Sequence, residues 1–540
     1  MLSYRKLAMR VLGRPFHTGR IDSPRPASQR AAAFILTAAM LTTLAAPAFA
    51  DIWHIENGDI TISAGESGNN VTQNNNTTYG DTNTIITNQN KDTASSHTVT
   101  IEAKDKDDKV EVTLKDVNID TSSRNKAAVS VTGEGDTNIK LDGDNALKSD
   151  IYRSGIYGSG SLTISGGEND SLTAQGGSGA NGISSSGSLT ISGGTVTANG
   201  DDGGRGISSS GSVTISGGST VTANGGSGTI SGGDGIWSGG GVTISGGSTV
   251  TANGGNGGSL VGGDGIRSGG GLTVSDGTVT AKGGNGDSKD GYGGDGIRSG
   301  GVVTISGNTV NAAGGYGGKV GGYGICSFDR VAISGGTVEA AGGNGSTGGG
   351  SGIYSSVIDL SGSLELTAKA GSPTGKALLQ NGRELDLDTI KDKLGPGAKV
   401  TTTDANGKTK EVSSPLPVEP EGPVIPEESS SSSDDGSATP SAPASPLPGL
   451  TVTDKDGQRI SYTSTQSGNT LTVCVGRFTA SFRISLAALR QLRAEGIETI
   501  TFQTVLCSTT LSVDELLAMG GEDAEAVLTH RFTDSSLTVG

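Results

Sequence analysis

The side chains best suited to chemistry in this chain follow a recurring Gly-Ile pair. An aromatic ring offers a flat apolar face that suits a sugar ring, and a guanidinium pairs with a carboxylate. Aromatic and Arg residues at successive repeats therefore indicate carbohydrate binding. The alternative is an ordinary exposed strand position that tolerates large residues. The candidates are Tyr157, Trp237, Arg267, Arg298 and Tyr354, and the other repeats carry Ser184, Ser208 and Cys326 here.

A carboxylate precedes three of these pairs, in the sequence Gly-Gly-Asp-Gly-Ile. If successive repeats stack, Asp234, Asp264 and Asp295 repel one another, and a calcium ion would relieve that repulsion. Calcium is therefore the one candidate cofactor. The alternative is structural, because Asp-Gly is also a common tight-turn dipeptide.

The same residues bear on catalysis. A polysaccharide lyase needs carboxylates that converge with one positioned Arg or Lys in a cleft. Here Asp264 with Arg267 recurs as Asp295 with Arg298, so no single constellation stands out. We therefore expect a protein that is not an enzyme.

Thr-x-Thr runs raise a further alternative, since flat Thr ladders can bind ice. The ladder breaks at Asn311 and Glu339, and Thr is simply a favourable outward residue in a strand. We expect no ice-binding function.

Three cysteines and four histidines complete the reactive residues. Cys474 and Cys507 lie on strand-like runs and are candidates for a disulfide in an extracellular setting. Cys326 is isolated in the repeats, and the histidines lack the spacing of zinc ligands.

These candidates must be positioned by a repeat of 24 to 31 residues. Each unit reads Gly-Ile-x-Ser, then Leu-Thr-Ile-Ser-Gly-Gly, then Thr-Val-Thr-Ala-Asn-Gly-Gly, and a loop of variable length follows. The pattern predicts three short strands per unit, with glycines at the turns and all insertions along one edge. The units begin at Gly155, Gly182, Gly206, Gly235, Gly265, Gly296, Gly324 and Gly352.

Apolar and polar residues alternate within each unit. Leu189, Ile191, Val196 and Ala198 would point inward, with threonines between them pointing outward. A single unit cannot bury such a row, but stacked units can. The sequence therefore predicts an all-β fold, a right-handed parallel β-helix with three strands per coil.

The chain divides into four parts. Residues 1–50 have a basic region, an apolar run and an Ala-Phe-Ala cleavage motif, so we expect a signal peptide and a secreted, extracellular or cell-surface protein. Residues 51–411 form the β-helix, with irregular first coils, Gly-rich repeats over about 155–370 and a C-terminal cap. Residues 412–449 are a Pro/Ser/Glu-rich linker that we expect to be disordered. Residues 450–540 are a small α+β domain.

Charge limits the partners. The chain carries a net charge of −16, and without the seven basic residues and one acidic residue of 1–50 it carries about −22. A nucleic acid needs a basic face, so nucleic-acid binding is not expected. After signal cleavage no transmembrane segment is expected, and we expect a monomer.

Several blocks together resemble a known family. The stretches WHIENGDITISAG, TVTIEA, VTLKDVNID and AAVSVTGEGDTNIKLDGDNALKS, followed by the Gly-rich repeats, are similar to the clostridial carbohydrate-binding β-helix family. The resemblance covers roughly residues 52–370. It implies a fold like that of polysaccharide lyases, a secreted or cell-surface location, and binding of acidic plant polysaccharide with calcium.

We therefore expect a non-catalytic protein that binds polysaccharide or a cell-surface glycan on an outward face of the β-helix. The alternative is an adhesin or structural stalk, in which the β-helix is a spacer and the C-terminal domain makes the contact.

Overall fold

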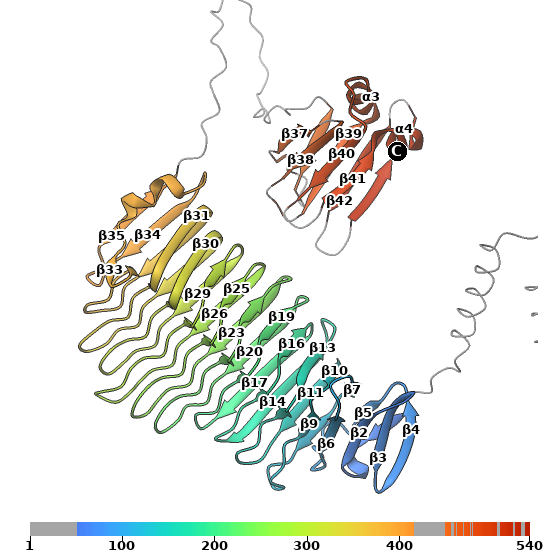
Figure 1. Ribbon diagram of the computed structural model, residues 1–540, viewed down its shortest axis with the longest axis vertical. Helices are drawn as coiled ribbons and strands as arrows, with labels where there is room; N and C mark the ends of the chain where they lie inside the picture. Colours follow the sequence, from blue (N-terminus) through green and yellow to red (C-terminus); the bar gives the residue numbers. More distant parts are fainter. Residues whose placement is uncertain are drawn as a thin grey trace, which may run out of the picture. The chain divides into compact units, whose positions relative to one another are not determined.

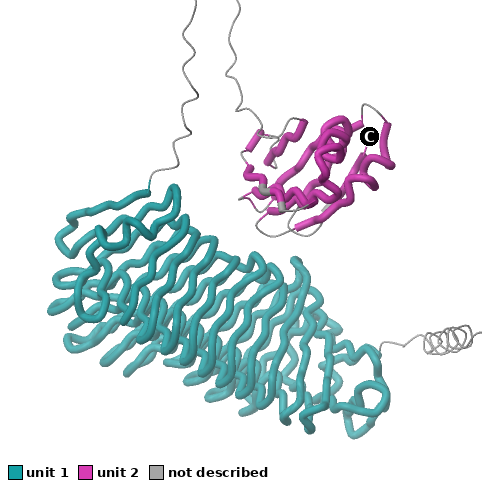
Figure 2. Tube along the Cα trace, turned by 45° about the horizontal axis from the view of Figure 1, so that its top comes forward, with its two compact units in different colours: residues 1–420 teal, residues 421–540 magenta. Residues whose placement is uncertain are grey.

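The protein is seen here in a computed structural model, which describes residues 51–414 and much of 449–539. In the second range the described residues are 449–454, 458–460, 462–467, 469–475, 477, 479–504, 508–521, 524–530 and 535–539. The predicted signal peptide and most of the predicted linker lie outside the described residues. The chain divides near residue 420 into two compact units (Figure 2).

The first unit is a β-solenoid of about 13 turns, which confirms the predicted stacking of repeats (Figure 1). Each regular coil supplies three strands, and each strand pairs in parallel with the strand three places further along the chain. Strand β12, Ile156–Gly158, thus pairs with β15, Ile183–Ser185. The strands fall into three columns, A, B and C, which run along the solenoid.

Column A includes the strands that begin at the Gly-Ile pairs and the strands that stack on them in the irregular coils. Its members are β2 (Ile60–Gly65), β6 (Val99–Ala103), β9 (Val129–Gly133), β12, β15, β18 (Ile207–Ser209), β21 (Ile236–Ser238), β24 (Ile266–Ser268), β27 (Ile297–Ser299) and β32 (Leu378–Gln380). Two long strands, β30 (Ile325–Ala341) and β31 (Ile353–Lys369), pass through all three columns.

Column B follows column A around each coil. Its members are β1 (Ile52–His54), β5 (Ile85–Thr87), β7 (Lys109–Lys115), β10 (Asp136–Asp142), β13 (Ser161–Ser165), β16 (Leu189–Ser192), β19 (Val213–Ser216), β22 (Val242–Ile244), β25 (Leu272–Val274) and β28 (Val303–Ile305). Column C holds β8 (Asn118–Asp120), β11 (Asp144–Lys148), β14 (Ser171–Ser178), β17 (Thr195–Asp201), β20 (Thr220–Asn224), β23 (Ser248–Asn253), β26 (Gly277–Lys282), β29 (Thr309–Ala313) and β34 (Lys399–Thr403).

The core is built by the predicted alternation. Leu189, Ile191, Val196 and Ala198 are fully buried, whereas Thr195 between them is exposed. Each inward residue lies on its equivalent in the next coil, as Ile191 pairs with Ile215. Burial of one such side chain contributes about 1.5–3 kcal/mol, and stacking is what removes it from water.

The variable loops also stack, and glycine makes this possible. The carbonyl of Gly233 accepts the N–H of Gly255, whose carbonyl accepts that of Gly263, at 2.8 Å each. A Cβ on Gly263 would lie only 1.9 Å from the oxygen of Gly233. The insertions therefore form an ordered glycine wall along one edge, as the position of the length variation predicts.

Both ends of the solenoid depart from the regular coil. At the first end β2 forms an antiparallel meander with β3 (Gly68–Gln73) and β4 (Asn76–Asp81). At the other end, the predicted C-terminal cap contains two 3-10 turns, η2 (Leu387–Thr389) and η3 (Lys391–Lys393). The antiparallel pair of β34 and β35 (Thr409–Ser413) follows, and β33 (Arg383–Glu384) pairs with β32. Because β35 ends at Ser413, the strands continue past the predicted boundary at 411.

The described residues of the second unit form two four-stranded sheets. One is β36 (Leu450–Thr453), β39 (Ala480–Ser485), β42 (Glu525–His530) and β43 (Ser535–Val539), and the other is β37 (Thr463–Ser467), β38 (Thr470–Cys474), β40 (Thr499–Gln503) and β41 (Ser508–Ser512). Two helices, α3 (Leu486–Ala494) and α4 (Val513–Met519), begin after capping serines. Its core includes Phe482 against Phe502, with ring centroids 4.9 Å apart. No helix among the described residues has the length and apolar character that a membrane crossing requires.

Candidate functional site

The predicted binding residues lie in one row on column A. The register pairs Ser208 with Trp237, Trp237 with Arg267, and Arg267 with Arg298. Tyr157 lies three coils before Trp237, and Tyr354 lies two coils after Arg298. Neighbouring positions are therefore one strand spacing, about 4.8 Å, apart.

Trp237 is in contact with Arg205, which the sequence analysis does not include among the candidate site residues. The Arg205 guanidinium lies over the indole, with its Cζ 4.4 Å from the ring centroid, and its Nε donates to Asp234 Oδ2 at 3.3 Å. Arg205 comes directly before Gly206-Ile207, as Asp234 comes before Gly235-Ile236. The repeat therefore places Arg205 and Asp234 at equivalent positions of neighbouring coils. Only the side-chain directions in the structure show that Arg205 contacts Trp237. Because Arg205 already lies over the ring, a sugar that stacked on Trp237 would have to use another part of the indole.

The three aspartates form a hydrogen-bonded ladder. Asp234 Oδ1 accepts the backbone N–H of Asp264 at 2.9 Å, and Asp264 Oδ1 accepts that of Asp295 at 2.7 Å. Asp295 Oδ1 accepts the N–H of Tyr323 at 2.7 Å. Asn181 does the same for Arg205 at 2.8 Å, so an amide oxygen serves equally well. Each side chain satisfies a backbone donor of the next coil.

Burial sets the charge of this ladder. Burial, with the nearby Asp295 and Asp234, raises the pKa of Asp264 well above its usual range. Burial also raises the pKa of Asp295 to about 6, although the Tyr323 N–H and the Arg298 guanidinium favour its charged form. The ladder therefore carries less negative charge near neutral pH than three free carboxylates would.

Predicted sugar-binding residues and predicted calcium ligands line the same cavity, which has a volume of about 570 Å³ and which we call the Arg pocket. Three guanidinium groups reach it, and the glycine wall supplies much of the rest of its lining. Arg205 pairs with Asp234 and Arg298 pairs with Asp295, whereas no carboxylate of the described residues lies within ion-pair distance of Arg267. The charged and polar side chains of the lining include Asn181, Arg205, Asp234, Asp264, Arg267 and Arg298.

The ladder does not fit the calcium site that the sequence suggests. Each aspartate gives one oxygen to a backbone N–H, and the second oxygen of Asp234 and of Asp295 faces a guanidinium. Within the described ranges, no three His, Cys, Asp or Glu side chains come together as a metal site. The repulsion that calcium would relieve is relieved here by hydrogen bonds, Arg pairing and raised pKa values.

Tyr354 lies outside the Arg pocket and packs against the ring of a second tyrosine, Tyr323. Its ring stacks on Tyr323, with centroids 5.1 Å apart and an angle of 16° between the planes. Cys326 is buried nearby, and burial raises the pKa of its thiol to about 12. An inert thiol and a paired ring indicate packing at this end of the row.

Tyr157 lies in a second cavity of about 690 Å³, which we call the Tyr pocket. Apart from Ser184, sequence reasoning missed the rest of its lining, which comes from the irregular coils before the Gly-rich repeats and from the first repeat. The side chains that matter below are Lys126, Tyr152, Arg153, Tyr157 and Ser184.

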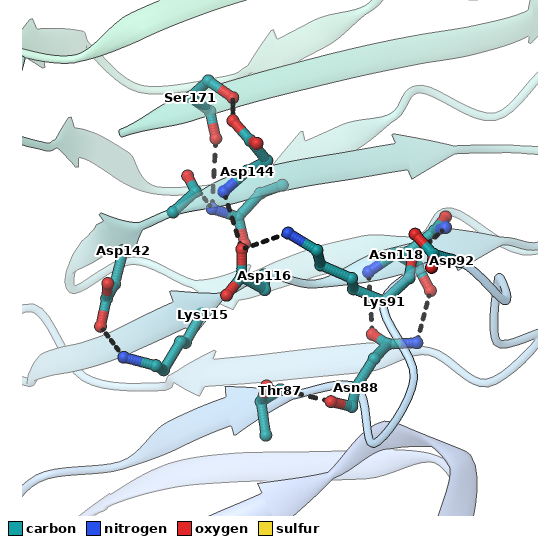
Figure 3. Close-up of polar contacts among 12 residues, drawn as sticks. Thr87, Asn88, Lys91, Asp92, Lys115, Asp116, Asn118, Asp142, Asp144 and Ser171 are labelled. Atoms are coloured by element: carbon teal, nitrogen blue, oxygen red, sulfur yellow. Dashed lines mark hydrogen bonds and ion pairs between the residues drawn. The ribbon is translucent and has the colours of Figure 1, made fainter. Parts of the chain in front are cut away.

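A separate polar cluster lies at the turn between columns B and C in the first coils (Figure 3). Lys115 Nζ pairs with Asp142 at 2.7 Å, and Asp116 Oδ1 accepts the backbone N–H of Asp144 at 3.2 Å. Ser171 Oγ donates to Asp144 at 2.8 Å. These contacts join neighbouring coils at the turn, and we assign them a structural role.

The disulfide prediction cannot be placed, because Cys507 lies outside the described residues. Cys474 is partly buried at the end of β38, and its Sγ lies 3.5 Å from Gln503 Oε1.

Comparison of the chain with protein-family models, with curated proteins and with solved structures returns no match.

Proposed function

We propose that the β-solenoid is a non-catalytic module that binds an acidic polysaccharide on column A. One observation carries the proposal: Arg205, Arg267 and Arg298 line a single cavity beside the half-buried Trp237. Guanidinium groups match sugar carboxylates, and the indole gives an apolar platform. The charge needed by an anionic ligand comes from arginine, so the proposal does not depend on calcium.

Binding without bond cleavage is proposed because the acidic groups of the cavity already have structural partners. Asp234 and Asp264 accept backbone N–H groups of the next coil. The extracellular location remains a proposal that rests on residues 1–50 of the sequence, and the right-handed coil rests on the general preference of parallel crossovers.

The experiment compares two forms of one polymer. Chain 51–540 is titrated calorimetrically with de-esterified polygalacturonate and with the methyl-esterified form, which lacks the charge. We expect binding to the first, weakened by salt, and little to the second. Equal binding to both would contradict recognition of carboxylates.

The stalk remains a second candidate because the two units have separate cores. In this case the first unit is a spacer, and the second unit makes the contact. If chain 51–540 ignored the polymer but adhered to cells through its second unit, the stalk function would replace the first proposal.

A further inference from the structure

The Tyr pocket repeats the chemistry of the Arg pocket. Tyr152 and Tyr157 are exposed, and the cations Lys126 and Arg153 accompany them. Lys126 Nζ is held by Asp59 at 2.9 Å, while Arg153 Nε donates to Asn125 Oδ1 at 3.3 Å. Aromatic and cationic side chains thus line the Tyr pocket together, whereas the aromatic residue of the Arg pocket, Trp237, lies outside the lining and against Arg205.

The two cavities occupy successive coils of the solenoid. They share the coil that contains Asn181 and Ser184, because Asn181 lines the Arg pocket and Ser184 lines the Tyr pocket. Both cavities lie where the loops enter column A, so they follow one another along the solenoid.

Small residues separate the two aromatic platforms. Ser184 and Ser208 occupy the row between Tyr157 and Trp237, and Ser208 is only 7% exposed. The two aromatic positions are three strand spacings, about 14 Å, apart. From Thr100 to Arg298 the row covers seven spacings, about 34 Å. A chain that reaches from Tyr157 to Trp237 would pass over these two short side chains.

We infer that the Arg pocket and the Tyr pocket are two subsites of one groove, which binds a single acidic polysaccharide chain running along the solenoid. This inference rests on the proposed function and adds the direction of the chain and its minimum length. A short oligomer occupies either subsite, whereas a long oligomer occupies both at once. The second contact is then intramolecular, so its effective concentration is high.

The test is calorimetry of chain 51–540 with oligogalacturonates of increasing length, using methyl-esterified oligomers as controls. We expect short oligomers to bind weakly at two per protein and long oligomers at one per protein. The affinity should rise on the order of 10²-fold once both subsites are spanned. Tyr157→Ala should abolish that rise and leave one short oligomer per protein, and Arg153→Ala should weaken the same step. Lys282→Ala, on column C, is the matched control.

Two outcomes would overturn this inference alone. If short and long oligomers bound with the same affinity and number, or if Tyr157→Ala behaved as the wild type, the Tyr pocket would not be a subsite. In both cases retained binding would leave the proposed function standing. The absence of any binding to acidic oligomers would overturn both proposals.

Discussion

The carboxylate of Asp264 accepts the backbone N–H of Asp295 on the next coil at 2.7 Å, while both side chains are buried. This contact gives a structural reason for the acidic residue that recurs before the Gly-Ile pair. The position requires a side-chain oxygen that can accept the backbone N–H of the next coil, and it does not require a charge.

Asp264→Asn should therefore keep the fold, because the amide oxygen can accept the same hydrogen bond, as Asn181 does for Arg205. Asp264→Ala removes the acceptor and leaves a buried N–H unpaired, which costs about 1–3 kcal/mol. Chemical unfolding of both variants at pH 7 measures the difference. Equal destabilisation by the two substitutions would show that the hydrogen bond is unimportant.

The raised pKa of Asp295 predicts that its contribution to folding stability falls as the pH rises, which is opposite to the usual behaviour of a carboxylate in an ion pair. Its pKa rises from 3.8 to about 6 on folding, so between these values the folded chain binds more protons than the unfolded chain. Its contribution to stability is therefore full below pH 4 and is lost as the pH rises through 6. The melting temperature of Asp295→Asn, relative to the wild type, should increase between pH 4 and 7. A constant difference across that range would refute this account.

The glycine wall predicts a sharp contrast between two nearby glycines. A Cβ on Gly350 would lie 1.8 Å from the oxygen of Gly322, whereas one on Gly348 meets no atom closer than 3.5 Å. Gly350→Ala should cost about 1–3 kcal/mol, and Gly348→Ala less than about 1 kcal/mol. Thermal unfolding of the two variants measures this contrast, and similar melting temperatures would mean that the loops are not packed as described.

Much of the β-solenoid could be predicted, because its fold follows from the regular repeat of apolar and polar residues along the chain. The alternation of Leu189 and Ile191 within one unit, repeated at every unit, requires stacked strands whatever the loops do. The location of the insertions follows from the same alignment. These features need no knowledge of side-chain direction.

The site could be predicted only in part. The row through Trp237 and Arg267 follows from the repeat, but Arg205 occupies a different position in its own unit. Its contact with Trp237 depends on the direction of the Arg205 side chain at the turn before Gly206. The repeat length in the sequence gives no information about that direction. The aspartate ladder shows the same limit, because stacked carboxylates suggest repulsion until their backbone partners are known.

Calcium offers a direct check on this interpretation of the ladder. If Arg residues supply the positive charge, a chelator should change the affinity for de-esterified polygalacturonate by less than about twofold, since five of the six aspartate oxygens already have partners. Titrations with and without chelator, followed by calcium addition, measure this. Binding that vanished with chelator and returned with calcium would restore the calcium site.

The central claim is that the Arg pocket binds carboxylates, and Arg267→Ala tests it most directly. Arg267 is exposed, so its removal should leave the melting temperature unchanged. We predict that it weakens binding of de-esterified polygalacturonate about tenfold or more, as expected for loss of a charged hydrogen bond of about 1.5–3 kcal/mol. Lys282→Ala, an exposed cation on column C, should bind as the wild type does. Equal binding by Arg267→Ala, Lys282→Ala and the wild type would contradict the account.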